Sequence, residues 1–318
     1  MKKVFIDGSE GTTGLRIGER LAGRDDLELL RIDPDLRKDP AERKKLLNAA
    51  DIAVLCLPDA AAREAVALVE NPETVVIDAS TAHRTQPGWA YGFPELGDNF
   101  RDSLAQGKRI AVPGCHASGF IALMRPLTCA GVVAPDYPVV CHSVTGYSGG
   151  GKSMIADYQG GNPSPALESP RQYGLGQVHK HQPEMKRYGG LWYAPVFNPI
   201  VADFYAGMAV SVPLHTRAMA RPMTPAGIRE LFREFYEGQA LVSVAAAQDE
   251  RVVPKGFLAA NLLAGCDDMV LYVDGNDDRL QLTALFDNLG KGASGAAVQC
   301  LNIAIGADET RGLTLWRK

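Results

Sequence analysis

In the first 110 residues, short apolar segments alternate with amphipathic ones. The apolar segments are VFIDG (4–8), LELLRID (27–33), DIAVLCLP (51–58) and TVVIDAS (74–80). The segments between them have helical spacing of apolar residues or helix-start signals, as in TGLRIGERLAGR (13–24), DPAERKKLLNAA (39–50) and AAREAVALVEN (61–71). Alternating strands and helices predict an α/β domain with a doubly wound parallel sheet of the Rossmann type.

The pattern changes after Pro113. The later segments are an apolar helix (116–131), a strand (138–146), a Gly/Pro-rich stretch (159–190) and further strands at 206–214 and 270–288. The last of these contains Asp274-Gly275-Asn276, which predicts a hairpin. Strand runs with few helices predict an α+β domain with a mixed or antiparallel sheet. We therefore expect a dinucleotide-binding domain at 1–114, joined by a C-terminal helix at 293–318, and a catalytic and oligomerisation domain at 115–292.

Composition excludes several classes of protein. Apolar residues make up 46% and charged residues 22% of the 318 positions, as in ordinary globular proteins. The formal net charge of −4 gives no sign of a nucleic-acid or acidic-membrane partner. No apolar run reaches the length of a membrane span, and MKKVFIDGSE (1–10) is a first strand and not a signal peptide. Six scattered cysteines without a CxxC pair indicate reduced thiols and a cytoplasmic protein.

The first glycine-rich loop, DGSEGTTG (7–14), follows a strand and opens a helix. Its spacing is Gly8-x-x-Gly11-x-x-Gly14, which departs from the usual G-x-G-x-x-G. Small residues still allow the backbone to approach a pyrophosphate, and the helix N-terminus supplies N–H donors. Three hydroxyls add further donors: Ser9, Thr12 and Thr13. The loop predicts a dinucleotide site.

The end of the second strand bears on the choice of cofactor. It mixes an acid, Asp33, with basic residues: Arg31, Arg37 and Lys38. An acid at this point favours NAD, whereas a nearby arginine accommodates the 2′-phosphate of NADP. The residues leave the choice open and lean towards NADP(H).

A second glycine-rich stretch, GYSGGGKS (146–153), fits the phosphate-loop pattern G-x-x-x-x-G-K-[ST] and follows a strand. A phosphate loop must open a sustained helix, but KSMIADYQ (152–159) runs only eight residues before GGNPSP (160–165). The strand that would hold magnesium, VLYVD (270–274), turns straight into a hairpin. A loop in which the backbone approaches some other ligand is the better interpretation, with a nucleotide hydrolase as the alternative.

The stretch AVPGCHASGF (111–120) contains the candidate nucleophile. Pro113 and Gly114 form a turn, and Cys115 stands directly before an apolar helix. A helix N-terminus stabilises a thiolate and makes the thiol nucleophilic. The alternative is a small buried hydrophobic residue, which is the interpretation we give the other five cysteines.

Two histidines offer a proton carrier for this cysteine. His179 and His181 lie in HKHQPE (179–184), and Pro183 favours an extended conformation at Gln182. If residues 179–182 are extended, both histidines point to the same side, and one can serve as general acid-base. A zinc site is the alternative, but no further pair of ligands has the right spacing, so we expect no metal.

The segment DASTAHR (78–84) follows a buried strand. It brings Ser80 and Arg84 to the carboxyl edge of the sheet, where doubly wound folds bind ligands. An arginine there suits a phosphate or a carboxylate, and a solvated surface arginine is the alternative.

Taken together, these segments resemble N-acetyl-γ-glutamyl-phosphate reductases of the shorter of two sequence types. The family signature is a Pro-Gly-Cys turn leading into a helix that ends at proline, here PGCHASGFIALMRP (113–126). His116, Ser118 and Leu123 depart from the commoner choices, in keeping with the shorter type. The resemblance runs along nearly the whole chain, through segments 7–17, 56–66, 78–84, 91–96, 112–119, 145–152, 179–184 and 289–302.

The resemblance implies an NADPH-dependent enzyme of arginine biosynthesis, similar in design to aspartate-semialdehyde dehydrogenases. Cys115 would form a thioester from an acyl phosphate, and His181, in preference to His179, would handle the proton. Arg84 would hold the phosphate, and Ser148 and Glu184 would contact the substrate. The remaining cofactor contacts would be Ser80, Gly149, Gly150, Lys291 and Gly292. A homo-oligomer, dimer or tetramer, is expected because the sheet of the second domain would leave an apolar face to cover.

Besides the nucleotide hydrolase, two other interpretations remain at this point. One is a related semialdehyde dehydrogenase that acts on another acyl phosphate. The other is a non-catalytic, NADP-sensing protein in which Cys115 is structural.

Overall fold

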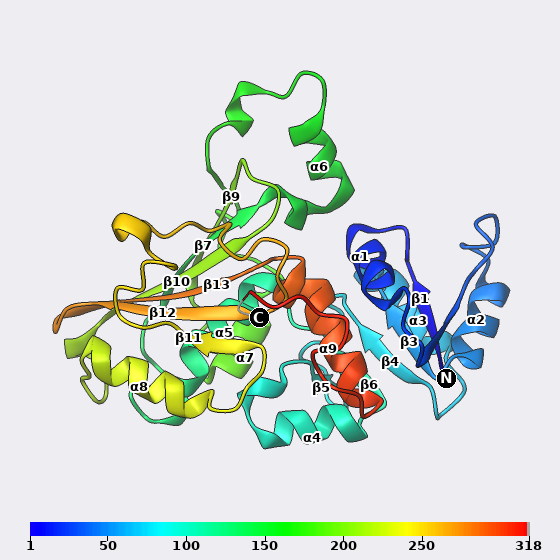
Figure 1. Ribbon diagram of the computed structural model, residues 1–318, viewed down its shortest axis with the longest axis horizontal. Coiled ribbons are helices and arrows are strands. Elements are labelled where there is room, and N and C mark those ends of the chain that lie inside the picture. Colours follow the sequence, from blue (N-terminus) through cyan, green and yellow to red (C-terminus); the bar gives the residue numbers. More distant parts are fainter. Residues whose placement is uncertain (317–318) are drawn as a thin grey trace. The chain divides into compact units, whose positions relative to one another are not determined.

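The computed structural model describes residues 1–316 of the chain (Figure 1). The chain divides into two compact units. Unit 1 consists of Met1–Gly114 and Ala293–Leu313, and unit 2 consists of Cys115–Gly292 and the residues from Thr314 onward. Within the described residues, no helix is both long enough and apolar enough to cross a membrane.

Unit 1 contains a six-stranded sheet in the order β2-β1-β3-β4-β6-β5, and every neighbouring pair is parallel. The predicted Rossmann-type sheet is therefore confirmed. Its strands are β1 (Lys2–Asp7), β2 (Leu27–Leu30), β3 (Ile52–Leu55), β4 (Val75–Asp78), β5 (Ala90–Tyr91) and β6 (Arg109–Ala111). Its helices are α1 (Thr12–Leu21), α2 (Pro40–Ala49), α3 (Asp59–Leu68), α4 (Asp98–Gln106) and α9 (Gly295–Ala304).

A local capping signal marks the start of helix α2. In α2 the side chain of Asp39 accepts a hydrogen bond from Glu42 N, and Pro40 occupies the first turn, as the sequence predicts.

Helix α9 is apolar on nearly every side because it lies in the core of unit 1, where Val298 and Leu301 pack with Val4 and Ile17 of β1 and α1. Burial on all sides is what an all-apolar helix requires.

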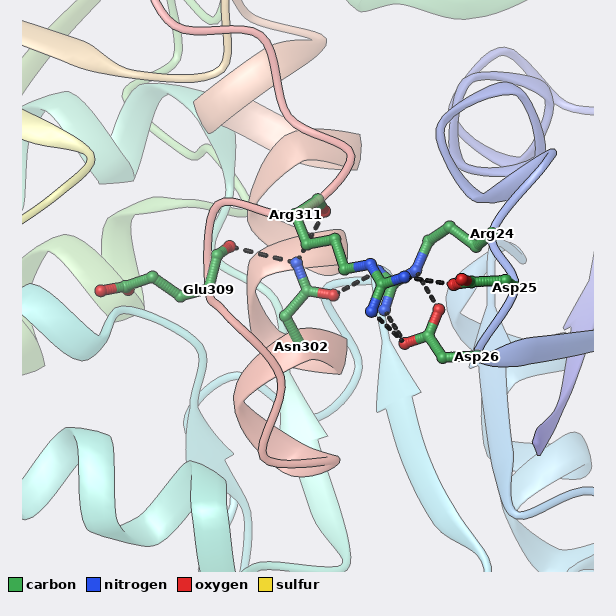
Figure 2. Close-up of polar contacts among 6 residues, drawn as sticks. All are labelled: Arg24, Asp25, Asp26, Asn302, Glu309 and Arg311. Carbon is green, nitrogen blue, oxygen red and sulfur yellow. Dashed lines mark hydrogen bonds and ion pairs between the residues drawn. The ribbon is translucent and has the colours of Figure 1, made fainter.

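A cluster of charged and amide side chains ties α9 and the segment after it to the turn between α1 and β2 (Figure 2). Arg24 donates to both carboxylate oxygens of Asp26 and to Asn302, and Arg311 pairs with Asp25 and Asp26. The hydrogen bond from Arg24, opposed in part by burial, lowers the pKa of Asp26 to about 2. Asn302 donates to the carbonyls of Glu309 and Arg311, which fixes the course of the chain after α9.

The C-terminal helix expected at 293–318 is shorter than that, so the predicted extent is wrong. Helix α9 ends at Ala304, and residues 314–316 belong to unit 2. There Thr314 N donates to Asp267 and Trp316 N donates to Asp268. Gly306 and Gly312 have positive φ and allow the chain to turn after the helix. Residues 317 and 318 lie outside the described residues.

Unit 2 contains a seven-stranded mixed sheet in the order β11-β12-β13-β10-β7-β9-β8. Its strands are β7 (Val140–Gly146), β8 (Arg171–Gln172), β9 (Val196–Ala202), β10 (Met208–His215), β11 (Val242–Val244), β12 (Met269–Gly275) and β13 (Arg279–Phe286). Its helices are α5 (Cys115–Cys129), α6 (Gly151–Gln159), α7 (Gln182–Gly189) and α8 (Pro225–Phe235). The predicted hairpin is confirmed, since β12 and β13 pair in antiparallel fashion.

The helices of unit 2 pack on the sheet. Helices α5 and α8 contact its strands, and α7 packs against α5. Most of helix α5 is buried, which explains its largely apolar composition. Helix α8 and strands β9 and β11 have no counterpart among the predicted elements. Thr224 caps α8 with Pro225 in the first turn, and Ile228, Leu231, Phe232 and Phe235 have the spacing of one helix face. Local signals for α8 are therefore present in the sequence and were overlooked.

Candidate active site

The turn after β1 is shaped by close backbone contacts. Gly8 has φ +87°, and a Cβ there would lie 2.4 Å from the carbonyl oxygen of Cys56. A Cβ on Gly14 would lie 2.4 Å from the carbonyl oxygen of Gly8. Gly11 is less constrained, because its Cβ would meet that oxygen only at 3.4 Å. Gly8 and Gly14 are therefore required by the turn, whereas Gly11 is a glycine that the fold alone does not demand.

Helix α1 begins at this turn, and Gly11 is its N-cap residue. Among the described residues, no side chain caps the helix there, so the helix N-terminus has no built-in acceptor. The predicted hydroxyls of Ser9, Thr12 and Thr13 are half-buried around it. Main-chain N–H groups at a helix start, framed by glycines that let an anion approach, suit the pyrophosphate of a dinucleotide. The residues present therefore fit a nicotinamide dinucleotide.

The segment after β2 is exposed throughout its charged part. Arg31, Asp33, Arg37 and Lys38 are all exposed. Asp33 accepts a hydrogen bond from Asp35 N, and Arg37 lies 3.8 Å from Glu10. Exposed arginines near the α1 turn can accommodate a 2′-phosphate, in keeping with the lean towards NADP.

The segment after β4 forms a buried network within unit 1. Asp78 accepts hydrogen bonds from Ser80 N and Oγ, and its other close partner is Nδ1 of His83, at 2.6 Å. The ring of His83 stacks on Trp89 with centroids 4.1 Å apart, so this histidine has a structural place in the network. Ser80 therefore lies beside the end of β4, where its hydroxyl is already engaged with Asp78.

Arg84 is buried, with only 7% of its surface exposed, so the alternative of a solvated surface arginine is wrong. Its Nε donates to the carbonyl oxygen of Val112 at 2.8 Å, and its Nη2 donates to that of Ala79 at 3.2 Å. These bonds join the ends of β4 and β6. Through these two hydrogen bonds, Arg84 supports the main chain that leads towards Cys115.

Cys115 is the first residue of α5 and is half-buried. Gly292 lies directly against it, because a Cβ on Gly292 would come within 2.9 Å of the Cys115 Cβ. The neighbouring Lys291 is 2% exposed and lies in one π-helical turn (Gly290–Ser294). Such turns often occur at functional sites. The place of Cys115 at a helix start, predicted from the Pro-Gly-Cys turn, is confirmed.

The two histidines lie together, but not for the predicted reason. Residues 179–182 are not extended: Gln182 N donates to His179 O, and His181 N donates to Nδ1 of His179. Pro183 sits in the first turn of α7 (Gln182–Gly189), where proline is compatible with helix, so it does not extend Gln182. The two rings meet edge to face with centroids 4.8 Å apart. His181 is buried.

His116, which follows Cys115 directly, has no role that the sequence pattern predicts. His116 is buried, and its ring lies 5.6 Å from that of His179 and 5.5 Å from that of His181. It is hydrogen-bonded to Ser143 on β7 and to Tyr173. Ser143 and Tyr173 went unnoticed because their proximity depends on the pairing of β7, β8 and β9, which no local pattern reveals. Glu184, in the first turn of α7, is also buried.

The stretch 146–153 does not have the setting of a phosphate loop. It follows β7, which pairs with β10 in antiparallel fashion, and it opens a helix of nine residues. Lys152 is exposed. A Cβ on Gly146 would lie 2.6 Å from the carbonyl oxygen of Tyr205, so this glycine serves the close approach of two main chains. Gly149 and Gly150 are exposed.

Ser148 is buried, and Asn288 holds it. Asn288 Nδ2 donates to Ser148 Oγ at 3.0 Å, and Asn288 Oδ1 accepts from Gly207 N at 2.9 Å. Asn288 is a further residue that sequence reasoning missed, since it follows a strand distant in the chain. Within residues 1–316, no group of three or more His, Cys, Asp or Glu side chains has the geometry of a metal site.

Comparison with known proteins agrees with this arrangement. Residues 4–105 match a family model described as "Semialdehyde dehydrogenase, NAD binding domain", and residues 115–288 match one described as "Semialdehyde dehydrogenase, dimerisation domain". In solved structures, aspartate semialdehyde dehydrogenase II of Vibrio cholerae has a TM-score of 0.71 at 16% identity, over 96% of this chain and 98% of that one. This likeness shows the fold.

Curated relatives are more similar in sequence. A Nostoc protein named N-acetyl-gamma-glutamyl-phosphate reductase 2 is 44% identical over 98% of this chain and 99% of its own length. A Chelativorans protein named N-acetyl-gamma-glutamyl-phosphate reductase is 47% identical over 95% and 98%. A third relative, from Pseudomonas putida, is 45% identical over 97% and 98%. The chain therefore belongs to the semialdehyde dehydrogenase family, among its N-acetyl-γ-glutamyl-phosphate reductases.

Proposed function

We propose that this chain uses NADPH to reduce N-acetyl-γ-glutamyl phosphate to N-acetylglutamate 5-semialdehyde and phosphate, a step of arginine biosynthesis, through a thioester on Cys115. The observation that carries the proposal is the place of Cys115 as the first residue of α5 in the unit that also holds the contacting pair His179 and His181. A nucleophile and a proton carrier are what acyl transfer to sulfur requires. The names of relatives at 44–47% identity indicate which acyl group the substrate carries.

The turn after β1 would hold the cofactor. Main-chain N–H groups in the first turn of α1 would bind the pyrophosphate, and the hydroxyls of Ser9, Thr12 and Thr13 would add donors. The other proposed cofactor contacts are Ser80, Gly149, Gly150, Lys291 and Gly292. When bound, NADPH supplies the hydride that reduces the thioester carbon.

Cys115 would carry the acyl group between two steps. Its thiolate attacks the acyl carbon, a carbon–sulfur bond forms, and the carbon–oxygen bond to phosphate breaks with release of phosphate. After reduction of that carbon, His181 donates a proton to the tetrahedral oxygen and then takes it back as the aldehyde forms and the thiolate leaves. A thioester accepts hydride more readily than a carboxylate, which is the reason for covalent catalysis here. His179 contacts His181 and is the alternative proton carrier.

Three residues would contact the substrate. Arg84 is proposed for the phosphate, and Ser148 and Glu184 for the remainder of the molecule. Ser148 is held by Asn288, so its hydroxyl has a fixed position, as a binding residue needs.

The identity of the substrate is tested by assaying the reverse reaction with NADP, phosphate and either N-acetylglutamate 5-semialdehyde or aspartate semialdehyde. A preference for aspartate semialdehyde would replace the proposed acyl chain.

Unit 2 would also form a homodimer. On β7 and β9, every second residue is buried, while the residues between them, such as Val140, Val144, Val196 and Ile200, remain half-buried or exposed. Val140 pairs with Val196 and Val144 with Ile200, so these four side chains form a strip on the sheet that is apolar except for His142 and Asn198, which pair between them. An apolar strip of this kind fits an interface, and the match to a dimerisation domain makes a second copy its occupant.

The dimer is tested by light scattering of wild type and Ile200→Glu. A wild-type mass of two chains that falls to one in the variant supports the strip as the interface. A mass of two chains in both would place the interface elsewhere on the protein.

A further inference from the structure

The side chain that follows the nucleophile, His116, is fixed at both ring nitrogens. Its Nδ1 lies 2.7 Å from Ser143 Oγ, and its Nε2 lies 2.7 Å from the Tyr173 hydroxyl. His116 is 3% exposed and Ser143 is fully buried. Three separate segments therefore meet at one imidazole: the first turn of α5, strand β7 and the chain after β8.

The same ring is a packing surface for the proposed proton carriers. Its centroid lies 5.6 Å from that of His179 and 5.5 Å from that of His181. On another side it meets Phe197 at 5.2 Å, and Phe197 also contacts His179. Movement of the His116 ring would therefore change the position of both histidines.

His116 is suited to this place because it stays neutral. Burial, and then the charges of His179 and Lys180, lower its pKa to about 3. A neutral imidazole has one donor and one acceptor, so one of its two hydroxyl partners donates and the other accepts. The ionisable groups that face the ring or act on its surroundings are Cys115, Tyr173, His179, Lys180 and His181. Ser143 and Phe197, from β7 and β9, do not titrate in this range.

Tyr173 links the ring to the nucleophile. Burial raises the pKa of its hydroxyl, and the charge of Cys115 raises it further, so the hydroxyl remains protonated and lies within electrostatic range of the sulfur. The hydrogen-bonded series Ser143–His116–Tyr173 thus runs from the sheet to the surroundings of Cys115, and its members keep their protons.

We propose that His116 is a positioning residue for the reaction at Cys115: bridging Ser143 and Tyr173, it fixes the His179–His181 pair against which its ring packs. This inference rests on the function proposed above. Misplacement of a proton carrier by about 1 Å can cost on the order of 10²-fold in rate. The effect is expected on kcat and on the titration of the two histidines, because His116 is not among the residues proposed to contact phosphate or semialdehyde.

The test breaks the two links separately and together, with Ser143→Ala, Tyr173→Phe and the double variant. Each single change is expected to lower kcat about tenfold or more, with KM for phosphate and semialdehyde within about threefold of wild type. The double variant should lose less than the product of the single losses, because both links act through one ring. Tyr137→Phe is the matched control, since Tyr137 also has a hydrogen-bonded hydroxyl in unit 2, bonded to His215 N; it should keep wild-type kcat.

A second readout does not depend on turnover. In ¹⁵N-histidine NMR spectra, Tyr173→Phe should shift the titration midpoint of His179 or His181 by about half a unit or more, and Tyr137→Phe should not. Unchanged midpoints, or losses of kcat that multiply in the double variant, would overturn the positioning role. If wild type shows no turnover at all, the proposed function fails, and the NMR titration alone still decides whether His116 controls the pair.

Discussion

Cys115 and Cys129 are the first and the last residue of one helix, α5. Cys129 is exposed, whereas Cys115 is half-buried. If access alone set reactivity, iodoacetamide would modify Cys129 first. The positive end of the helix dipole stabilises a thiolate at Cys115, so we expect Cys115 to react faster at neutral pH.

Peptide mass spectrometry after short exposure to iodoacetamide measures this order. The other thiols are poor competitors: burial raises the pKa of Cys56 to about 12, and it also raises the pKa of Cys141 and Cys266. N-acetylglutamate 5-semialdehyde should protect Cys115 and leave Cys129 unaffected. Faster alkylation of Cys129 would mean that α5 does not activate its first residue.

Valine substitutions at Gly11 and Gly14 of the first loop are expected to have different effects. Gly11→Val should fold, because the nearest atom to a Cβ there is 3.4 Å away, yet its side chain would cover the start of α1 and abolish NADPH binding. Gly14→Val is the contrasting variant and should lose stability, because its Cβ would lie 2.4 Å from Gly8 O. NADPH affinity by fluorescence and Tm by calorimetry separate the two effects. Undiminished affinity in folded Gly11→Val would remove this loop from the cofactor site.

Arg84→Ala should lower Tm, since the carbonyls of Val112 and Ala79 lose their donors. Leaving a buried group without its partner costs about 1–3 kcal/mol. If Arg84 also holds the phosphate, the variant should raise KM for phosphate in the reverse reaction. Arg84→Lys is the control that keeps the charge. A lower Tm with an unchanged phosphate KM would assign Arg84 to the fold alone.

Acid should destabilise the protein through His116. Its folded pKa is about 3, against an ordinary 6.5, so below pH 6.5 the unfolded chain binds a proton that the folded one does not. The contribution of neutral His116 is therefore complete above pH 6.5 and is lost as the pH falls towards 3, at up to about 1.4 kcal/mol per pH unit.

Urea unfolding of wild type and His116→Asn between pH 7.5 and 5 tests this dependence. The variant should be less stable at pH 7.5, because it loses a bridge, but its stability should fall less steeply with pH. Parallel curves for the two proteins would show that His116 is not the group that titrates.

How much of the structure can be predicted from the sequence depends on whether the signal lies within a short stretch of the chain or between distant segments. Strands β1 to β4 of the first sheet and the helix that starts at Cys115 have local signals, namely apolar runs and the Pro113-Gly114 turn, and these elements were predicted. Strands β5 and β6 were not predicted, because two and three residues are too few to show a pattern. The conformation of residues 179–182 was predicted wrongly because Pro183 is compatible with two structures, and helix α7 decided between them. The partners of His116 and Ser148 come from strands far apart in the chain, and only the assembled sheet brings them together.

Turnover by Cys115→Ala tests the central claim most directly. With NADP, phosphate and N-acetylglutamate 5-semialdehyde, the wild-type protein should form NADPH. The variant should bind NADPH with wild-type affinity and keep its Tm, yet lose all measurable turnover, because no other side chain can carry the acyl group. If folded Cys115→Ala retains activity within a few fold of wild type, catalysis does not pass through a thioester, and the account given for Cys115 is wrong.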